Sequence, residues 1–283
     1  MNSADPFFLN QLLIVIVVYE QKISETRAFA SLDPIRKNAT ILIYDNSQAP
    51  QEFSKFSNLI YRHDEKNPGV SKAYNTAAQL ADEKQKTWLL LADQDTLFPD
   101  SFLFTYQQAL TEFPNEKLFA PILADRKGVI SPFSFHHAKG KRLSSALKPG
   151  VHNLMTYRIV NSGIMVSVRL FEKAGGYDER FSLDYSDIVF TDRLLLIHSF
   201  FVLVNSLLKQ NFSGSSEKNT VALLKRFNSF CSTVLLYKKT VAHQVPLLRV
   251  LLPRAIKLSL QTRNFQFLKI VIDSMLRRDT PKQ

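Results

Sequence analysis

An uninterrupted apolar run near the start of the chain limits the folds available to it. Residues 12–19 are Leu-Leu-Ile-Val-Ile-Val-Val-Tyr, which leaves no polar side chain before the final tyrosine to face solvent. Such a run is typical of a strand buried on both faces, as in a parallel sheet. Further apolar stretches predict strands with helices between them: strands at 39–44, 59–62 and 88–92, helices at 23–32 and 71–82. This alternation through residues 12–110 predicts an open α/β sheet.

Polar residues follow these strands directly, at the edge where open α/β sheets bind ligands. Tyr19 ends the first run, Asp45 follows the second, and Asp93 and Asp95 follow the run at 88–92. Side chains two residues apart share a face of extended chain, so we expect Asp93 and Asp95 to point together. Mg²⁺ takes one or two carboxylates and fills its remaining positions with phosphate oxygens and water. The alternatives are a solvated acidic turn after Ala92 and, at Asp45, a local turn closed by its own side chain.

The second half of the sequence is expected to continue the sheet. The predicted features are a strand at 118–123, a polar loop with His136-His137 and Lys139–Arg142, a strand at 157–168 with a bulge at Asn161-Ser162-Gly163, a helix at 170–174 ended by Gly175-Gly176, and a helix from Ile188. Ser71 is expected to cap the helix at 71–82. The adjacent histidines point apart on extended chain, so we expect no metal site there.

The composition of the chain bears on the cellular compartment in which it would fold. The chain has 283 residues and a single cysteine, so no intramolecular disulfide is possible, which fits a reducing compartment. Residues 1–10 lack a basic segment, and we expect no signal peptide. No apolar run reaches the ~18–20 residues that a membrane span needs.

The positive charge is concentrated at the C-terminal end. The net charge is +11, and residues 221–283 contribute 12 lysines and arginines against 2 acidic residues, a net +10. Basic residues interleaved with large apolar ones favour an anionic membrane surface over nucleic acid as partner. Residues 247–260 in particular have the pattern of a basic amphipathic helix. The alternative is an ordinary helical subdomain with a basic outer face.

Six short segments, taken in order, resemble a known enzyme family. They are Val17-Val-Tyr-Glu20, Tyr44-Asp-Asn-Ser47, Asn67-Pro-Gly-Val-Ser-Lys-Ala-Tyr-Asn75, Leu91-Ala-Asp-Gln-Asp-Thr96, Asn161-Ser-Gly-Ile164 and Gly175–Asp187. Together they span about residues 12–195 and resemble the inverting family 2 glycosyltransferases, whose rhamnosyltransferase-like members have a similar Asp-Gln-Asp-Thr segment. The resemblance implies a GT-A type nucleotide-diphospho-sugar transferase fold, which is an open mixed sheet flanked by helices with a helical C-terminal extension.

The resemblance also implies a domain organisation. We expect a catalytic domain over residues 1–210, with a nucleotide-binding half at about 10–110 and an acceptor half at about 111–210. A basic, apolar helical region over residues 211–283 would follow it.

The resemblance implies roles on the donor side. Asp95 would be a direct ligand of a divalent cation, Mg²⁺ or Mn²⁺, and Asp93 would lie nearer the ribose or the water of the metal. Such a cation stabilises negative charge on the diphosphate leaving group. Asp45 would accept hydrogen bonds from the nucleotide base. The other donor-binding residues would be Tyr19, Asn67, Gly69, Lys72 and Asn75. Lys72 would face phosphate, unless it is simply solvated in the first turn of its helix.

The acceptor side needs a base that deprotonates the attacking hydroxyl. The resemblance implies Asp187 in this role, with Asp184 as the alternative, and implies that Ser162 and Gly163 approach a sugar through their backbone. The family often has a histidine at the position of Asn211, used near the diphosphate or the metal. Asn211 is a departure, because an amide is a poorer metal ligand than an imidazole.

These assignments lead to an expected function. The chain would transfer a sugar, with rhamnose a candidate, from a dTDP- or UDP-linked donor to a glycan or lipid-linked acceptor with inversion. It would act in the cytoplasm, at the inner face of the cytoplasmic membrane, docked there through residues 221–283 and binding no nucleic acid. The alternative is a catalytically weak sugar-nucleotide-binding or scaffold protein of polysaccharide assembly. A nucleotidyltransferase would carry a glycine-rich loop after the first strand, which residues 17–21 lack.

Overall fold

The computed structural model describes residues 4–32, 38–52, 58–210, 219–241 and 245–276. The chain divides into two compact units, residues 1–134 with 141–212 and residues 135–140 with 213–283. The sequence-based expectation drew one boundary between residues 210 and 211, whereas the second unit here also takes the short segment 135–140.

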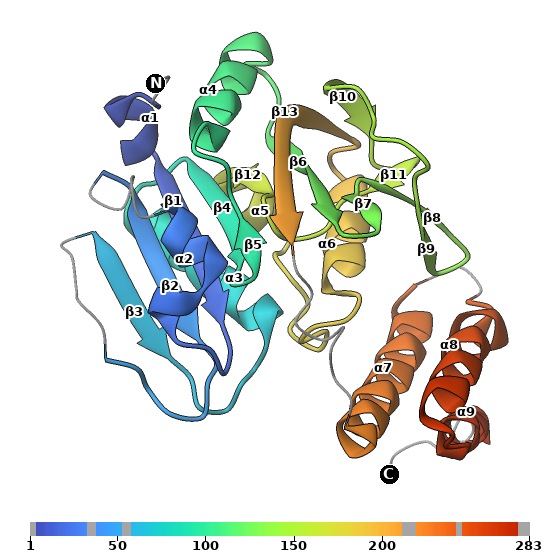
Figure 1. The fold of residues 1–283 in the computed structure, drawn as a ribbon. Helices are drawn as coiled ribbons and strands as arrows, with labels where there is room; N and C mark the ends of the chain where they lie inside the picture. The colour runs from blue at the N-terminus through green and yellow to red at the C-terminus, as the bar shows by residue number, and fades with distance from the viewer. Residues whose placement is uncertain (1–3, 33–37, 53–57, 211–218, 242–244, 277–283) are drawn as a thin grey trace. The chain divides into compact units, whose positions relative to one another are not determined.

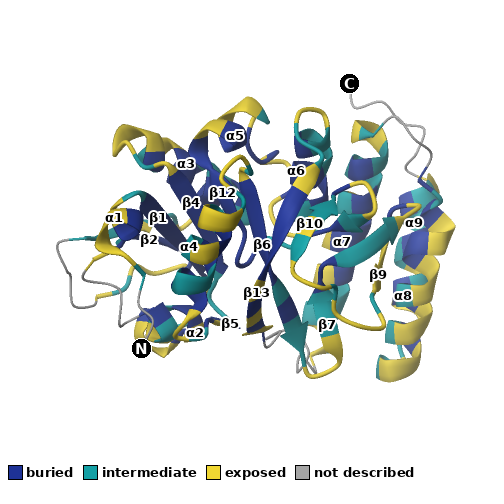
Figure 2. Ribbon diagram, turned by 90° about the horizontal axis from the view of Figure 1, so that it is seen from above, coloured by how far each residue is buried: buried dark blue, intermediate teal, exposed yellow. Residues whose placement is uncertain are grey.

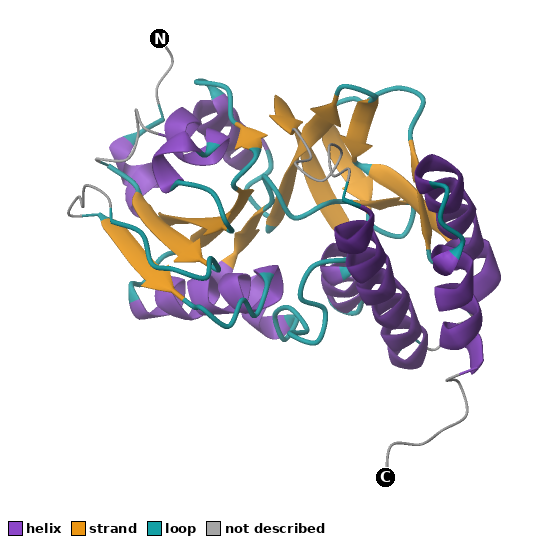
Figure 3. Cartoon of the chain, turned by 60° about the horizontal axis from the view of Figure 1, so that its bottom comes forward, coloured by secondary structure: helices purple, strands orange, loops and turns teal. Residues whose placement is uncertain are grey.

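The first unit is a mixed sheet between layers of helices (Figures 1 and 3). Its strands are β1 Leu12–Val18, β2 Thr40–Asp45, β3 Leu59–His63, β4 Trp88–Asp93, β5 Thr96–Leu97, β6 Leu118–Asp125, β7 Gly128–Ser131, β10 Gly150–Asn153, β11 Tyr157–Arg158, β12 Met165–Ser167 and β13 Phe200–Gln210. Its helices are α1 Pro6–Asn10, the 3-10 turn η1 Ile23–Glu25, α2 Arg27–Leu32, α3 Val70–Glu83, α4 Phe102–Glu112, α5 Val168–Lys173 and α6 Ser186–Leu195.

The strand order is β10-β13-β6-β12-β4-β1-β2-β3. Strands β4, β1, β2 and β3 are parallel, which is the arrangement that their continuous apolar runs predict. Strand β12 lies antiparallel between β4 and β6, and β6 is parallel to β13. The predicted open mixed sheet flanked by helices is therefore confirmed.

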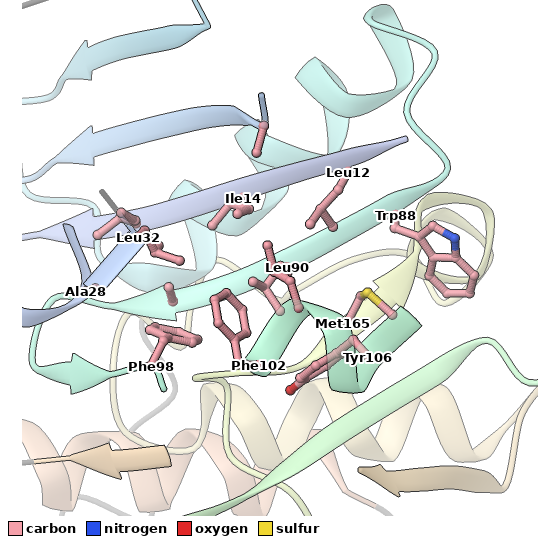
Figure 4. Packing of buried hydrophobic residues seen from close by; sticks show 14 of the residues in the cluster. Leu12, Ile14, Ala28, Leu32, Trp88, Leu90, Phe98, Phe102, Tyr106 and Met165 are labelled. Atoms are coloured by element: carbon pink, nitrogen blue, oxygen red, sulfur yellow. The ribbon is translucent and has the colours of Figure 1, made fainter. Parts of the chain in front are cut away.

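Alternate residues of β1 face opposite layers of helices, as the pleat of a strand requires. Leu12 and Ile14 belong to the buried cluster that includes α2 and α4 (Figure 4). Leu13 and Val15 belong to the cluster on the other face, with α3 and α5. Because both faces are covered, every residue of β1 is buried. Its neighbour β4, and β6 further along the sheet, are coloured largely as buried in Figure 2.

Several expected boundaries differ in the structure. Helix α3 begins at Val70, and the hydroxyl of Ser71 donates to the carbonyl oxygen of Phe181 instead of capping the helix. The helix expected at 23–32 is divided into η1 and α2. Helix α6 begins at Ser186, two residues earlier than expected.

The strand expected at 157–168 is interrupted. Strand β11 ends at Arg158 and β12 begins at Met165, and the chain between them turns through Gly163, whose φ is +89°. A Cβ on Gly163 would lie 2.4 Å from the side chain of Pro121, so the close packing here needs glycine.

The expected polar loop at His136-His137 and Lys139–Arg142 is wrong, because residues 133–142 form a β-hairpin. Strands β8 Phe133–His136 and β9 Lys139–Arg142 lie in a small sheet of order β11-β8-β9. The connecting residues His137 and Ala138 have φ of +50° and +61°, the pair of positive values that a tight two-residue hairpin turn requires.

The second unit contains the helices α7 Thr220–Thr240, α8 Leu247–Thr262 and α9 Gln266–Leu276. Its core is aromatic, with Phe227 edge-on to Phe267 at 5.6 Å between ring centroids and Tyr237 edge-on to Phe135 at 6.4 Å. The side chain of Asn219 caps the start of α7 by accepting from the backbone of Val221.

In the part of the chain that the structure describes, we find no helix whose length and hydropathy would suit a membrane span.

Candidate active site at the strand ends

The carboxyl ends of β2 and β4 lie on either side of β1. In the parallel register, Asp93 of β4 pairs with Val17 and Asp45 of β2 pairs with Val18. The two aspartates therefore stand at the same edge of the sheet, two strand spacings or about 10 Å apart. Tyr19 follows the end of β1 between them, so three strand ends bring their polar residues together.

Asp93 and Asp95 converge, although not by the extended geometry expected. Strand β4 ends at Asp93, and Asp95 lies in the turn that leads into β5. Strand β5 pairs antiparallel with the end of β13, which places Gln210 opposite Thr96. The Gln210 side-chain amide then donates to Asp95 Oδ1 at 2.8 Å and to Asp93 Oδ2 at 3.3 Å. A neutral amide from a distant strand thus bridges the two carboxylates.

Both carboxyl groups are held in unfavourable surroundings for a negative charge. Burial raises the pKa of Asp93, against the lowering effect of hydrogen bonds from Tyr74 and Gln210. The hydroxyl of Tyr74 donates to Asp93 Oδ1 at 2.7 Å. Burial, and next the charge of Asp93, raise the pKa of Asp95 to about 6, and the opposing effect of Arg27 is the smallest of those that act on it.

Asp187 lies close to this pair, in the first turn of α6. Its Oδ1 accepts a hydrogen bond from the backbone N–H of Ile188 at 2.8 Å. Burial raises the pKa of Asp187 to about 7, and the charges of Asp184 and Asp93 add to the effect. Tyr185, two residues before Asp187, has a φ of +65°. Such a strained backbone conformation is common at functional sites. Three acidic groups with raised pKa values are therefore gathered at this edge.

A layer of aromatic rings and amides connects the two sides of the site. Tyr177 stacks on Phe190 at 4.2 Å between centroids and meets Tyr74 at 5.1 Å. The Tyr177 hydroxyl donates to Asn161 Oδ1 at 2.8 Å, and the Asn161 amide donates to the hydroxyl of Ser186 at 3.1 Å. This chain of contacts fixes the start of α6, and with it Asp187, relative to the residue that holds Asp93.

Asp45 is saturated by protein donors. Its Oδ1 accepts from the backbone N–H of Ser47 at 2.9 Å, which is the local turn considered as an alternative. Its Oδ2 accepts from the Tyr61 hydroxyl at 2.8 Å and from the Gln51 amide at 3.1 Å. The residue has no exposed surface. In this structure Asp45 fixes the loop after β2 and presents no free oxygen to a base.

Three predicted donor-binding residues contact the loop at 177–182. A Cβ on Gly69 would lie 2.1 Å from the carbonyl oxygen of Ser182, so this glycine permits the loop to pack closely. The Asn75 side chain accepts from the N–H of Tyr177 at 2.8 Å and donates to its carbonyl at 3.0 Å. Lys72 Nζ lies 3.4 Å from Glu179 Oε1, with 39% of its side chain exposed.

The remaining donor-side residues differ in exposure. Tyr19 is half exposed, and its backbone N–H donates to Gln94 Oε1 at 2.7 Å, so Gln94 joins the ends of β1 and β4. Asn67 has a φ of +45° and is exposed in the turn before α3, where its N–H donates to the carbonyl of Asp64.

The acceptor-side residues lie next to the carboxylates. The buried Ser162 hydroxyl accepts from the N–H of Asp93 at 3.0 Å and shares a hydrogen bond with Thr96 at 2.7 Å. The N–H of Gly163 donates to the carbonyl of Leu91 at 2.8 Å. Asp184 is partly exposed in the loop before α6. Ser162 therefore acts through its side chain on the backbone of Asp93.

A metal site of protein ligands alone is not present among the residues described: no three histidine, cysteine or acidic side chains there could hold one ion. Asp93 and Asp95 are a donor pair for a hard cation only if substrate oxygens and water complete the coordination, which is how Mg²⁺ is commonly bound. Asn211 lies outside the described residues.

Sequence patterns alone missed the residues that organise this site. Gln210, Tyr74 and Tyr177 hold or surround the carboxylates, although Tyr74 and Tyr177 lie inside the segments that carry the family resemblance. A polar residue at the end of the apolar run in β13 was the available signal for Gln210.

Comparison with known proteins agrees with this fold. No protein-family model matches the chain. The dTDP-rhamnosyl transferase RfbF of Shigella flexneri is 24% identical over 182 residues, 63% of this chain and 61% of that protein. The match thus spans less than two thirds of the curated relative.

Solved structures of S. aureus TarS share the fold. TarS 1–349 in complex with UDP-GlcNAc superposes with a TM-score of 0.52 at 14% identity, covering 79% of this chain and 66% of TarS 1–349. A longer TarS structure gives a TM-score of 0.49 and is covered to 39%. The predicted GT-A type fold is confirmed, and in sequence the chain is similar to a dTDP-rhamnosyl transferase.

Proposed function

We propose that this chain is an inverting glycosyltransferase that takes a sugar from a nucleoside diphosphate donor. The observation that carries the proposal is the gathering of Asp93, Asp95 and Asp187 at the carboxyl edge of the sheet, each with a raised pKa. The resemblance to a dTDP-rhamnosyl transferase makes rhamnose the first sugar to test, with dTDP and UDP as the nucleotides. A glycan or a lipid-linked saccharide is the proposed acceptor.

Asp95 and Asp93 are the residues that would hold Mg²⁺ or Mn²⁺. They fit such an ion because two neighbouring carboxylates are bridged only by the neutral Gln210 amide, and burial disfavours their charge. When bound, the cation would stabilise negative charge on the departing diphosphate. Tyr74 would keep Asp93 oriented through its hydroxyl, and the Ser162 hydroxyl would hold the backbone of Asp93 in place.

Asp187 is the proposed general base. Its pKa of about 7 means that it is about half ionised at neutral pH and still basic enough to accept a proton from an acceptor hydroxyl. The hydrogen bond from Ile188 occupies Oδ1. Asp184, three residues earlier in the loop before α6, is the alternative base.

The donor nucleotide would lie across the end of β1. The half-exposed ring of Tyr19 offers a surface on which a base can stack. Lys72 holds its ammonium group at the exposed start of α3, where it can turn from Glu179 to a phosphate. Asp45 would act indirectly, by fixing the loop through Ser47, Gln51 and Tyr61.

A thermal-shift screen tests the proposal. Nucleoside diphosphate sugars with dTDP or UDP are added with Mg²⁺ or Mn²⁺, because a ligand that binds only the folded state raises the unfolding midpoint. We expect one base and sugar to raise the midpoint, and the same donor to release its nucleoside diphosphate when an acceptor glycan is supplied. If no nucleotide sugar shifts the midpoint with either cation, the proposal is wrong.

A binding or scaffold function without turnover is the second candidate. It is favoured by the Gln210 amide, which donates a hydrogen bond to both carboxylates. That function predicts donor binding with no release of nucleoside diphosphate, and an Asp187→Asn variant that behaves like the parent protein.

The location proposed for this reaction is the inner, cytoplasmic face of the cytoplasmic membrane. The net +10 over residues 221–283 supports contact with anionic lipid.

A further inference from the structure

Helix α8 carries two apolar faces, one of them uncovered. Leu247, Val250, Leu251 and Ala255 are buried in the second unit. On the other side Leu248, Leu252, Ile256 and Leu260 are 51%, 37%, 44% and 72% exposed. Figure 2 shows the outer side of α8 coloured largely as exposed. An amphipathic helix that has already buried one apolar stripe usually presents charged residues on the other side, so this second stripe needs an explanation.

The exposed residues follow helical spacing. They recur every four residues, and at about 100° per residue they fall within an arc of about 120°. We call Leu248, Leu252, Ile256 and Leu260 the outer stripe. Four large apolar side chains in one row along a helix form a continuous contact surface and are not scattered exposed residues of the kind that any protein has.

The charges around the outer stripe have one sign. Arg249 and Arg263 are exposed within this arc, at about 100° and 60° on the helical wheel that places Leu248 at 0°, and Arg263 lies at the end of the helix. Lys257 is exposed beside the arc, at about 180°. Helix α8 contains no acidic residue. Over residues 219–241 and 245–276 there are nine lysines and arginines and one acidic residue, Asp273. A partner that covers the stripe must therefore be apolar in its interior and anionic at its surface.

We propose that the outer stripe of α8 lies in the interface of an anionic phospholipid bilayer. The leucine and isoleucine side chains would enter the boundary of the acyl chains, and the long stems of Arg249, Lys257 and Arg263 would bring their charges to the headgroup phosphates. A second copy of the chain fits less well, because it would bring these basic residues against their own equivalents. This inference rests on the membrane location proposed above, but it does not require the transfer reaction.

Vesicle flotation without nucleotide or acceptor tests the inference. The full-length chain is mixed with vesicles of phosphatidylcholine, or of phosphatidylcholine with about one third phosphatidylglycerol. We expect binding to the anionic vesicles, weaker by about tenfold or more without phosphatidylglycerol or at high ionic strength. A Leu260→Trp variant gives a second readout, because the one native tryptophan, Trp88, is buried in the first unit and the new side chain should shift its emission to the blue on insertion.

Two variants with matched controls identify the face. Leu248→Gln with Leu260→Gln should lower binding by about tenfold or more, whereas Leu196→Gln with Ile197→Gln, equally exposed in the first unit, should not.

The charge variant follows the same design. Arg249→Gln, Lys257→Gln and Arg263→Gln should abolish the preference for anionic vesicles. The same charge removed from the exposed Arg126, Lys127 and Lys173 of the first unit should leave it largely intact.

Circular dichroism and the unfolding midpoint establish that each variant is folded, and donor-induced stabilisation should be unchanged in all of them. Three results would overturn the inference: no vesicle binding at either composition, binding that both α8 variants retain, or a concentration-dependent dimer that only the leucine variant loses. If the parent protein binds vesicles but no nucleotide sugar, that result would count against the proposed function and not against this inference.

Discussion

Two acidic positions stand at the same edge of the sheet and differ in what surrounds them. Asp45 has both carboxylate oxygens occupied by donors from Ser47, Gln51 and Tyr61. Asp93 and Asp95, two strand spacings away, share one amide from Gln210 and repel each other. In the sequence the two positions look alike, because each has an aspartate directly after an apolar run.

The difference shows where a ligand is needed. A saturated carboxylate stabilises its own loop and gains little from a cation. A pair whose charge is disfavoured by burial gains from any cation or proton that arrives, and Asp187 adds a third such group. One edge of the sheet therefore holds an acid that stabilises its own loop and three acids that we propose for binding and catalysis.

The largest expected effect is on turnover in Asp187→Asn. Removal of a general base should lower the rate of nucleoside diphosphate release to acceptor by about 10²–10⁴-fold while donor affinity stays close to that of the parent protein. Steady-state kinetics with the donor found by the thermal-shift screen measures it. Asp184→Asn is the control, since it removes a nearby carboxylate from the loop before α6. A larger loss in Asp184→Asn would transfer the base role to that residue.

Asp45→Ala should give the largest loss of stability. It leaves the Tyr61 hydroxyl, the Gln51 amide and the Ser47 N–H without their acceptor, at an expected cost of about 3 kcal/mol in the free energy of unfolding. Urea unfolding at pH 7 measures this. Asp95→Ala removes a carboxylate that burial disfavours, and should cost less than about 1 kcal/mol or add stability. Equal losses in the two variants would remove the distinction between the two positions.

The pH dependence of stability gives a third test. Asp187 and Asp95 have pKa values of about 7 and 6, above the ordinary value of 3.8, so the folded protein holds more protons than the unfolded chain between about pH 4 and 7. Stability should therefore fall as the pH rises from 5 to 8, by about 1–3 kcal/mol. Thermal or urea unfolding over this range measures the slope. In Asp187→Asn the slope of stability against pH should be smaller. An unchanged slope would mean that the pKa of Asp187 in the folded protein is not raised.

The smallest expected effect is that of Gln210→Leu. Loss of the bridging amide removes two hydrogen bonds that lower the pKa values of Asp93 and Asp95, so both should rise further and the unfolding free energy at pH 8 should fall by about 1 kcal/mol. The readout is the stability slope from pH 5 to 8, which should steepen. Gln210→Glu is the informative partner, because it adds a third carboxylate and should tighten Mn²⁺ binding.

Much of the sheet could be predicted from sequence, because its apolar runs are long and its strands are parallel. The position of Asp93 and Asp45 at one edge follows from that alone. The bridge from Gln210 could not be predicted, since it depends on the pairing of β5 with β13, which joins residues more than 100 positions apart.

Other contacts could not be predicted for a similar reason. The contacts of Gly69 and Asn75 with the loop at 177–182 are long-range, so a nucleotide-facing role was the simpler expectation from their segment. The hairpin at 133–142 was missed because its second strand is basic and exposed, while its alternating Phe133 and Phe135 and its turn at His137-Ala138 were the signals present.

Calorimetric titration of the selected nucleoside diphosphate sugar, with and without Mn²⁺, tests the central claim most directly. In the parent protein we expect donor binding that strengthens with Mn²⁺. In Asp95→Asn the binding should lose that dependence and weaken by about tenfold or more, and in Asp187→Asn it should persist. Binding that is indifferent to Mn²⁺ and equal in the parent protein and Asp95→Asn would contradict it, because the acidic pair would then have no part in holding the donor.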